Sequence, residues 1–378
     1  MPSTMGETLT VSVFGQSHSE AIGCVISGLP SGIKIDMDAV KEFMGRRAPG
    51  QGAWTTPRKE ADLPEVVSGL DAEGLTCGTP LACIIRNTNT RSQDYKNIAQ
   101  VPRPGHSDFC AWAKWGSAHD IRGGGHFSGR LTAPLCFAGA IALQILSEQG
   151  VSIAAHLSRI GDAADTRFAA FENTPESREL LAQQIATIQR HETTLSVIDA
   201  SASEAMLGEI DKARRAKDSV GGEIECVATG LPAGIGSPMF DGMENILARN
   251  IFGIPGVKGI EFGRGFEMAH MHGSENNDPF MVEDGACVPA TNNAGGILGG
   301  ITTGAPLLFR IAMKPTSSIS RPQQSVDLAH MEPAELEVHG RHDPCIVTRA
   351  VPVVEAVTAL SLLDAWLSYP ADTLFQKK

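Results

Sequence analysis

Tyrosine, charged residues and long runs of one charge are all scarce in this chain. Only 2 of the 378 residues are tyrosine, and 20% are charged against 42% that are hydrophobic. That balance excludes a disordered or fibrous chain and is enough for one or two compact domains with a large core. No Lys/Arg run offsets the formal net charge of −12, which disfavours nucleic acid and anionic membranes as non-specific partners. An anionic ligand therefore needs a local basic pocket.

Apolar runs long enough to span a membrane are also missing from the sequence. The longest, such as 133–145, are shorter than the ~20 residues that a membrane-spanning helix needs. The first residues, MPSTMGETLT, contain neither the cationic nor the apolar region of a signal peptide. We therefore expect a soluble protein of the cytoplasm.

The eight cysteines form no CxxC pair. Most have apolar neighbours, as at Cys136 and Cys345, so we expect reduced, buried packing residues rather than metal ligands or disulfides. His270 with His272, or His106 with Asp108, could begin a metal site, but no third and fourth ligand stands at a suitable spacing. We therefore expect no metal.

Glycine, by contrast, is abundant, with 40 residues. The glycines follow no repeating triplet, which excludes a collagen-like fibre. Clusters such as 123–125 and 295–296 are typical of tight turns at which the backbone can contact a ligand. No low-complexity linker divides the chain, so we expect residues 1–378 to form a single domain.

Apolar runs between glycines and prolines predict strands. They lie at 9–14, 24–27, 81–85, 223–228 and 307–313. Helical spacing predicts one helix capped by Asp36 or Asp38 and a second that opens at Thr174-Pro175. A third helix, charged and exposed, is predicted over about 203–217.

Two more predicted helices, 133–148 and 352–367, are apolar on nearly every side and have a proline in the first turn. Such helices lie between sheets or in an oligomer interface. Each follows a dense polar motif, DIRGGGH at 120–126 and GRHDP at 340–344. Both motifs are therefore expected beside a helix N-terminus, whose partial positive charge favours anions.

Some segments of the sequence recur weakly. SGLPSGI at 27–33 resembles TGLPAGI at 229–235, and 124–135 resembles 295–307. The two spacings differ, which is compatible with a duplicated two-layer unit that carries an insertion near 151–220. Recurring turn chemistry explains the pattern nearly as well.

Three segments are rich in Gly, His and Ser, and two of them also contain Arg. In FGQSH at 14–18 the predicted strand ends and His18 follows it, a suitable place for a proton donor. RPGHSD at 103–108 puts Arg103, which can bind an anion bidentately, near an imidazole that an aspartate can support. RGGGHFSGR at 122–130 opens its backbone to a flat or phosphorylated ligand, but it matches neither the dinucleotide nor the P-loop pattern. Each histidine taken alone is more often structural or solvated than catalytic.

Two further segments carry candidate chemistry. RHDP at 341–344, with Arg349 beyond it, can present Asp343 as a proton acceptor, although an ion pair is the alternative. KPTSS at 314–318 offers a lysine and three hydroxyls to a phosphate or to a ring edge, with a solvated loop as the alternative.

Ten motifs, in order and over nearly the whole chain, resemble those of chorismate synthase. They are FGQSH (14–18), SGLPSGI (27–33), RRAPG (46–50), TTPRKEAD (55–62), NTNTRSQDY (87–95), RPGHSD (103–108), DIRGGG (120–125), NAGGILGGI (293–301), KPTSSI (314–319) and GRHDPCIVTRAVPVVEA (340–356). The resemblance implies an α+β fold, a layered sandwich of antiparallel sheets with buried apolar helices, assembled as a homotetramer.

The resemblance also implies the reaction, a 1,4-anti elimination of phosphate from 5-enolpyruvylshikimate 3-phosphate that gives chorismate. Reduced FMN is implied as an obligatory cofactor, although the reaction has no net redox change. The length of the chain leaves no spare domain for a flavin reductase, so a separate flavin reductant is expected as a partner.

The resemblance assigns roles by position. It implies His18 as the acid for the departing phosphate, His106 as the group that protonates reduced flavin, and Asp343 as the group that helps flavin N5 accept the substrate's proton. The implied contacts to the substrate are Ser17, Arg46, Arg47, Arg103 and Arg130. The implied contacts to the cofactor are His126, Phe127, Ser128, Gly299, Lys314, Pro315, Thr316, Ser317, Ser318 and Arg341.

The chain departs from the family pattern at the glycine-rich segment. Most members read RGGGRSSARET where this chain reads RGGGHFSGRLT. His126, Phe127 and Leu131 therefore make the expected flavin wall less basic and more apolar. After the RRxPG motif, Ala53 replaces a usual arginine, and one phosphate or cofactor contact is lost unless Arg58 or Lys59 supplies it.

These departures leave two alternatives open. One is a paralogous flavin-dependent lyase that acts on another phosphorylated ring acid, and the other is a non-catalytic flavin-binding protein. Every residue assigned to proton chemistry is present, so a divergent but working enzyme is the leading interpretation.

Overall fold

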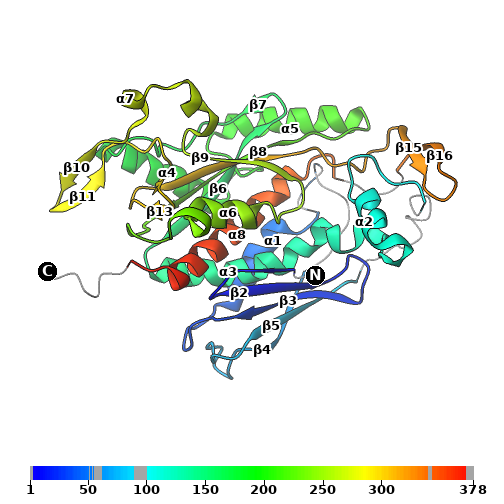
Figure 1. The fold of residues 1–378 in the computed structure, drawn as a ribbon, viewed down its shortest axis with the longest axis horizontal. Coiled ribbons are helices and arrows are strands. Elements are labelled where there is room, and N and C mark those ends of the chain that lie inside the picture. The colour runs from blue at the N-terminus through cyan, green and yellow to red at the C-terminus, as the bar shows by residue number, and fades with distance from the viewer. Residues whose placement is uncertain are drawn as a thin grey trace.

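Two five-stranded antiparallel sheets enclose a layer of helices. The computed structural model describes residues 3–50, 52, 54, 62–88, 100–338 and 343–371. In Figure 1 the sheet of N-terminal strands lies below, the sheet of later strands lies above, and long helices run between them. The predicted fold class, an α+β sandwich of antiparallel sheets with buried apolar helices, is confirmed.

The first sheet has the order β1-β2-β3-β5-β4. Its strands are β1 (Thr4–Met5), β2 (Thr10–Gly15), β3 (Ala21–Ser27), β5 (Leu81–Arg86) and β4 (Pro64–Ser68). In β3, Ile22, Cys24 and Ile26 are fully buried, and this alternation puts one face of the sheet against the helices. The three strands predicted in this half are confirmed.

The second sheet has the order β7-β6-β8-β14-β9. Its strands are β7 (Ala163–Ala164), β6 (Ser152–Ile160), β8 (Gly222–Thr229), β14 (Leu307–Met313) and β9 (Val257–Phe262). Its outer face carries α4 (Pro175–Arg190) and α5 (Ala200–Arg215). A separate buried cluster joins Leu181, Ile185 and Ile188 of α4 to Ala154 of β6. The predicted α4 is confirmed, and Thr174 caps it with its side chain.

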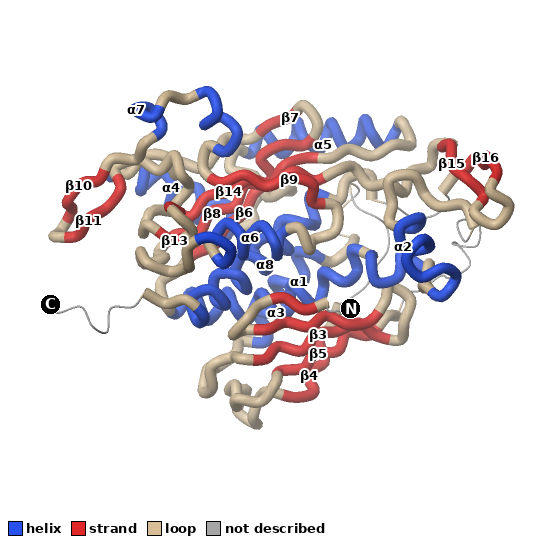
Figure 2. Tube along the Cα trace, in the orientation of Figure 1, coloured by secondary structure: helices blue, strands red, loops and turns tan. Residues whose placement is uncertain are grey.

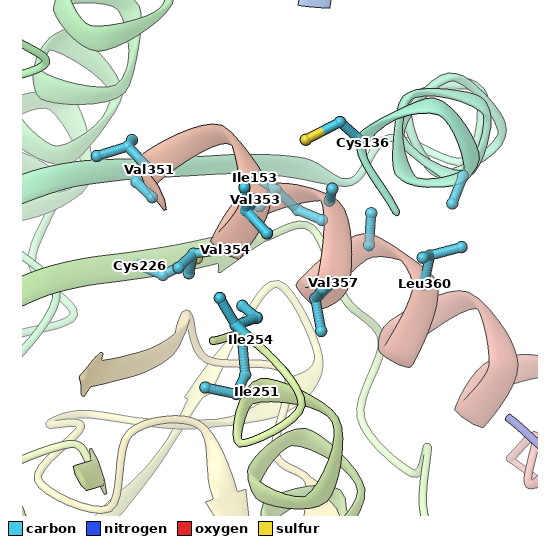
Figure 3. Close-up of a cluster of buried hydrophobic side chains, with 14 of the residues drawn as sticks. Cys136, Ile153, Cys226, Ile251, Ile254, Val351, Val353, Val354, Val357 and Leu360 are labelled. Carbon is cyan, nitrogen blue, oxygen red and sulfur yellow. The ribbon is translucent and has the colours of Figure 1, made fainter. Parts of the chain in front are cut away.

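Four helices fill the space between the sheets: α1 (Met37–Arg47), α3 (Thr132–Glu148), α6 (Met243–Ile251) and α8 (Val347–Ser368). Asp36 caps α1, one of the two caps predicted. Figure 3 shows Val353, Val354 and Val357 of α8 among side chains of the second sheet and α6. Because α8 touches neighbours on all sides, it is apolar all round, as the sequence indicates.

Two helical segments, Gly129–Glu148 and Val347–Ser368, are long and apolar enough to cross a membrane by length and composition alone. Their most apolar windows are 72% and 89% buried inside the protein, as expected for core helices. Both helical segments are longer than the apolar run 133–145 in the sequence.

The predicted start of α8 at 352 was wrong. The helix begins at Val347, so Pro352 lies in its interior instead of its first turn. A proline removes the hydrogen bond to the carbonyl four residues earlier. Here Val347, Ala350 and Val351 are buried, and their packing stabilises the additional turn.

Short elements decorate this sandwich. Three two-stranded hairpins lie outside the large sheets, and Figure 2 shows two of them toward opposite ends of the molecule. The hairpins pair β10 (Phe280–Glu283) with β11 (Ala286–Pro289), β12 (Ile297–Leu298) with β13 (Ile301–Thr302), and β15 (Gln323–Asp327) with β16 (Glu332–Leu336). The short helices are α2 (Asp108–Trp115), α7 (Gly273–Asn276), η2 (Gly116–Ala118), η3 (Arg122–Phe127), η4 (Gly129–Leu131), η5 (Met239–Asp241) and η6 (Gly265–His270).

The recurring turns 27–33 and 229–235 have the same hydrogen-bond pattern. In the first, the Thr76 hydroxyl accepts from the amide of Ile33 and donates to the carbonyl of Pro30. In the second, the Thr302 hydroxyl accepts from Ile235 and donates to Pro232. Each turn follows the strand at the third position of its sheet's order, β3 or β8.

The cysteine prediction was correct for five residues and wrong for three. Cys24, Cys83, Cys136, Cys226 and Cys345 are free and buried, and burial raises the pKa of the Cys136 and Cys345 thiols to about 12. The exposed ones are Cys77, Cys110 and Cys287. Apolar sequence neighbours do not identify a buried position where the chain lies at the surface.

Candidate active site

A cavity of about 550 Å³ opens where η3, the start of α2, the N-terminus of α8 and the end of β14 meet. Many of the predicted site residues line it: Ser17, Arg47, Arg103, His106, His126, Phe127, Ser128, Arg130, Lys314, Pro315, Thr316, Ser317, Ser318 and Asp343. Among the described lining residues, five are Lys or Arg and one is acidic. The net charge of −12 therefore conceals a locally cationic pocket.

The glycine-rich loop brings two histidines to this cavity. Gly123 and Gly124 have φ of 61° and 83°, values that side chains rarely adopt. A Cβ at Gly123 would lie 2.5 Å from Ser17 Oγ and 2.9 Å from His18 Nε2, and one at Gly124 would lie 3.5 Å from His106 Nε2. A side chain at Gly123 would therefore clash with Ser17 and His18, whereas at Gly124 the positive φ, and not a lack of space, favours glycine. His18 is not among the lining residues, but it lies directly behind Gly123.

His106 is oriented by a buried carboxylate. Its Nδ1 lies 2.5 Å from Asp108 Oδ1, the shortest contact of that nitrogen, which assigns the Nδ1 proton to this hydrogen bond and turns Nε2 toward Gly124. Arg103 donates to both oxygens of Asp108, at 2.7 and 2.8 Å. Burial alone would raise the pKa of the Asp108 carboxyl, but hydrogen bonds from Arg103 and His106 hold that pKa well below its usual range. Asp108 therefore remains ionised.

The 314–318 loop adjoins the same cluster. Arg103 donates to the Ser318 hydroxyl at 3.1 Å, and Lys314 Nζ donates to the carbonyl of Gly105. Pro315, Thr316 and Ser317 complete this wall of the cavity. The lysine and hydroxyls thus lie together, as a phosphate or the polar edge of a ring requires.

Asp343 and Arg349 close the cavity at the N-terminus of α8. Arg349 Nη1 donates to Asp343 Oδ2 at 2.7 Å, and Arg349 Nε donates to the carbonyl of Arg47 at 3.1 Å. Arg349 lines the cavity, although sequence reasoning gave it no site role. Its position in the RHDPCIVTRA motif was the available signal.

Three predicted residues lie elsewhere or outside the described ranges. Arg46 does not line the cavity, because its guanidinium binds both oxygens of Glu355, at 2.6 and 3.1 Å. Gly299 lies in the turn between β12 and β13, away from the described lining residues. Arg341 falls outside the described residues.

Of the residues that depart from the family pattern, His126 and Phe127 line the cavity and are exposed, Leu131 is buried in the core, and Ala53 lies outside the described residues, as do Arg58 and Lys59. His126 Nδ1 lies 2.7 Å from the carbonyl of Gly15, and its Nε2 lies 2.6 Å from Ser3 Oγ. The Phe127 ring packs against Trp115 with their centroids 5.9 Å apart. His126 thus ties the glycine-rich loop to the N-terminal strands, and Phe127 supplies a flat apolar surface. No group of His, Cys, Asp and Glu side chains suited to a metal is found in the described part of the chain.

An α+β sandwich with a cationic cavity, two histidines against a glycine-rich loop and an aspartate behind one of them defines an enzyme for a small anionic ligand. The family model for chorismate synthase matches residues 9–367. The chain belongs to the chorismate synthase family.

Relatives cover nearly the whole chain. A chorismate synthase of Lancefieldella parvula is 52% identical over 98% of both chains, and one of Methanocella arvoryzae is 45% identical over 97% of this chain and 94% of its own. A solved crystal structure of chorismate synthase superposes with a TM-score of 0.71 at 25% identity, and covers 96% of this chain and 93% of that one.

Proposed function

We propose that this protein is a chorismate synthase that eliminates phosphate from 5-enolpyruvylshikimate 3-phosphate in a 1,4-anti sense. The observation that supports this most directly is the cationic cavity with His18 and His106 on either side of the glycine-rich loop. The names of the relatives described above give no support to a paralogous lyase or a non-catalytic flavin-binding protein.

The cationic side chains hold the substrate's anions. Arg47, Arg103, Arg130, Arg349 and Lys314 line one cavity, and guanidinium groups bind carboxylates and phosphates through paired hydrogen bonds. Charge that develops on the leaving phosphate is stabilised by such fixed donors. Arg46 has no part in this clamp, since it neutralises Glu355.

Proton transfer falls to three residues. The reaction breaks a C–O bond to phosphate and a C–H bond and forms a C=C bond, so one proton leaves carbon and the phosphate departs with the C–O electron pair. His18 protonates the departing phosphate. His106 would protonate the reduced cofactor through Nε2, the nitrogen that faces Gly124. Asp343, held by Arg349, would assist the reduced cofactor in taking up the proton that leaves carbon.

Reduced FMN fits the donors of the cavity. Lys314, Thr316 and Ser317 offer an amine and hydroxyls to its phosphate, and Phe127 offers a flat face to its ring. When bound, reduced FMN supplies an electron-rich ring that assists C–O cleavage without net redox change. The ring nitrogens of His126 are engaged by Gly15 and Ser3, so within segment 126–128 contact with the cofactor would fall mainly to Phe127 and Ser128.

The same proposal includes the cellular setting and the organisation of the chain. We propose a cytoplasmic homotetramer that depends on a separate flavin reductant. The matching hydrogen bonds of Thr76 and Thr302 support a single domain with an internal pseudo-duplication. The segment between β6 and β8, which holds α4 and α5, is the insertion in the second half.

The direct test is anaerobic. Protein, FMN, dithionite and 5-enolpyruvylshikimate 3-phosphate are mixed without oxygen, and chorismate and phosphate are measured. We expect equal amounts of both, and none with oxidised FMN. Bound reduced flavin without chorismate would overturn the proposal.

A matched pair of substitutions locates the activity in the cavity. Arg103→Lys is expected to lower kcat/KM by roughly tenfold or more, because lysine cannot form the paired hydrogen bonds of a guanidinium. Arg178→Lys, on α4 and paired with Glu283 at the surface, is expected to leave kcat/KM unchanged. Equal effects in both variants would place the substrate elsewhere.

A further inference from the structure

Arg47 and Arg130, which both line the cavity, share one buried carboxylate. Arg47 Nη1 donates to Asp62 Oδ2 at 2.7 Å, and Arg130 Nη1 donates to Asp62 Oδ1. The side chain of Asp62 is 1% exposed. Building on the proposed function, we propose that Asp62 is a positioning residue that fixes both guanidinium groups for the substrate's anions.

Asp62 lies behind the arginines with respect to the cavity. Arg47 and Arg130 are among the lining residues and Asp62 is not. An anion that enters therefore meets the guanidinium groups without displacing the carboxylate. Asp62 acts on the substrate only through the two arginines.

Additional hydrogen bonds fix the plane of each guanidinium. Arg47 Nε donates to Thr132 Oγ1 at 3.0 Å, and Arg47 Nη2 donates to the carbonyl of Gly129 at 3.0 Å. Arg130 Nε donates to Asn87 Oδ1 at 3.0 Å. Because all three guanidinium nitrogens of Arg47 and Nε and Nη1 of Arg130 donate to the protein, the plane of each group is set before the ligand arrives. Binding then avoids the entropy cost of ordering two long side chains.

The charge balance gives Asp62 a second effect on the same pair. The side chains of Arg47 and Arg130 are each only 4% exposed, so their mutual repulsion is weakly screened by solvent. One carboxylate between them reduces the charge of the group from +2 to +1. Without it the two guanidinium groups would move apart and lose their shared direction.

The test is Asp62→Asn. Asparagine has the same shape and, like aspartate, tolerates the left-handed backbone at this position, where φ is 48°. Its amide accepts from one arginine and presents N–H groups to the other. We expect KM for the enolpyruvyl substrate to rise roughly tenfold or more while kcat changes less than about threefold, because ground-state and transition-state binding weaken together.

The matched control is Asp165→Asn, which also removes a fully buried carboxylate, one paired with His156 behind the second sheet. KM is expected to be unchanged in this variant. An unchanged KM in folded Asp62→Asn, or an equal rise in both variants, would overturn the proposal. If Asp62→Asn does not fold, Thr132→Val removes the acceptor of Arg47 Nε, and we expect a severalfold rise in KM. An unchanged KM in Thr132→Val would also contradict the proposal.

Binding of inorganic phosphate separates this inference from the proposed function. Calorimetry with the full-length protein is expected to show weaker phosphate binding in Asp62→Asn than in the wild type or Asp165→Asn. If the wild type forms no chorismate but this difference is present, the proposed function fails and the role of Asp62 as a positioning residue holds. Equal phosphate affinity in all three proteins would contradict the role of Asp62.

Discussion

Two histidine–carboxylate clusters in this protein use the same chemical groups in opposite ways. At the cavity, His106 uses Nδ1 for Asp108 and turns Nε2 toward the glycine-rich loop. In the second sheet, His156 is fully buried and uses both nitrogens, with Asp165 at 2.8 Å and Glu225 at 3.2 Å. A ligand can reach a nitrogen of the first ring, whereas the second ring is enclosed.

The difference comes from what lies opposite each ring. Opposite His106 is Gly124, which has no side chain to fill the space. Opposite His156 on the next strand is its register partner Glu225, and the Phe168 ring packs edge-on with centroids 4.7 Å apart. A histidine and a carboxylate thus make a candidate catalytic pair where glycine leaves access, and an internal ion pair where side chains close it.

The largest loss of activity is expected when His106 is removed. His106→Ala is expected to lower kcat by about 10²–10⁴-fold while the fold stays intact, because a positioned proton-transfer group is lost. The control is His272→Ala, whose side chain is 87% exposed and which is expected to have wild-type turnover. Wild-type kcat in folded His106→Ala would remove this residue from the mechanism.

Asp343→Ala is expected to lower kcat by a factor of the same order as His106→Ala, about 10²–10⁴-fold.

Replacing the carboxylate beside each histidine by its amide tests whether only the cluster at the cavity contributes to turnover. Asp108→Asn keeps the shape but loses the charge that holds both His106 and Arg103, so we expect kcat to fall by about 10–10²-fold. Asp165→Asn makes the same chemical change beside His156 and is expected to leave kcat unchanged. Steady-state kinetics at saturating substrate measures both. Similar losses in the two variants would mean that both clusters act only through stability.

The sequence predicted most of the longer core elements and the loops that meet at the cavity, but it did not predict β6, β9, α2 or α6. Period-2 and helical apolar patterns follow burial directly, so β3, β14, α3 and α4 could be predicted from the order of apolar and polar residues. The glycine run at 123–125 predicted a close approach of the backbone. It could not predict that the closest groups would be His18 and His106, because that contact depends on how the chain folds back on itself.

The pairing of individual charges could not be predicted. Arg46 and Arg47 are adjacent on α1, so their side chains leave the helix about 100° apart. One binds Glu355, which lies 309 residues later, and the other lines the cavity. The sequence RR alone does not indicate which arginine binds Glu355 and which lines the cavity. Asp62 was part of a matching motif, but its role depends on the two arginines that converge on it.

His156→Gln is expected to change kcat very little. Its main effect is expected on the free energy of unfolding. Burial alone would lower the pKa of His156, but hydrogen bonds with Asp165 and Glu225 raise it above its ordinary value of 6.5. The imidazolium thus offsets two buried carboxylates, while Arg167 contacts Glu225 at 3.2 Å from the other side. Loss of one partner of a buried ion pair costs about 3–5 kcal/mol, and kcat is expected to stay within about twofold of the wild type, because this ring does not line the cavity.

The pH dependence of that stability difference follows from the direction of the pKa shift. A raised pKa in the folded state means that the contribution of His156 is fully present below pH 6.5, the unfolded value, and declines as pH rises through the folded value. Urea unfolding of the wild type and His156→Gln between pH 5.5 and 9.5 measures it. The difference in free energy of unfolding should be largest at the acidic end and shrink toward the alkaline end. A difference that grows with pH would show that His156 is buried in its neutral form, and the two clusters would then differ in charge as well as in access.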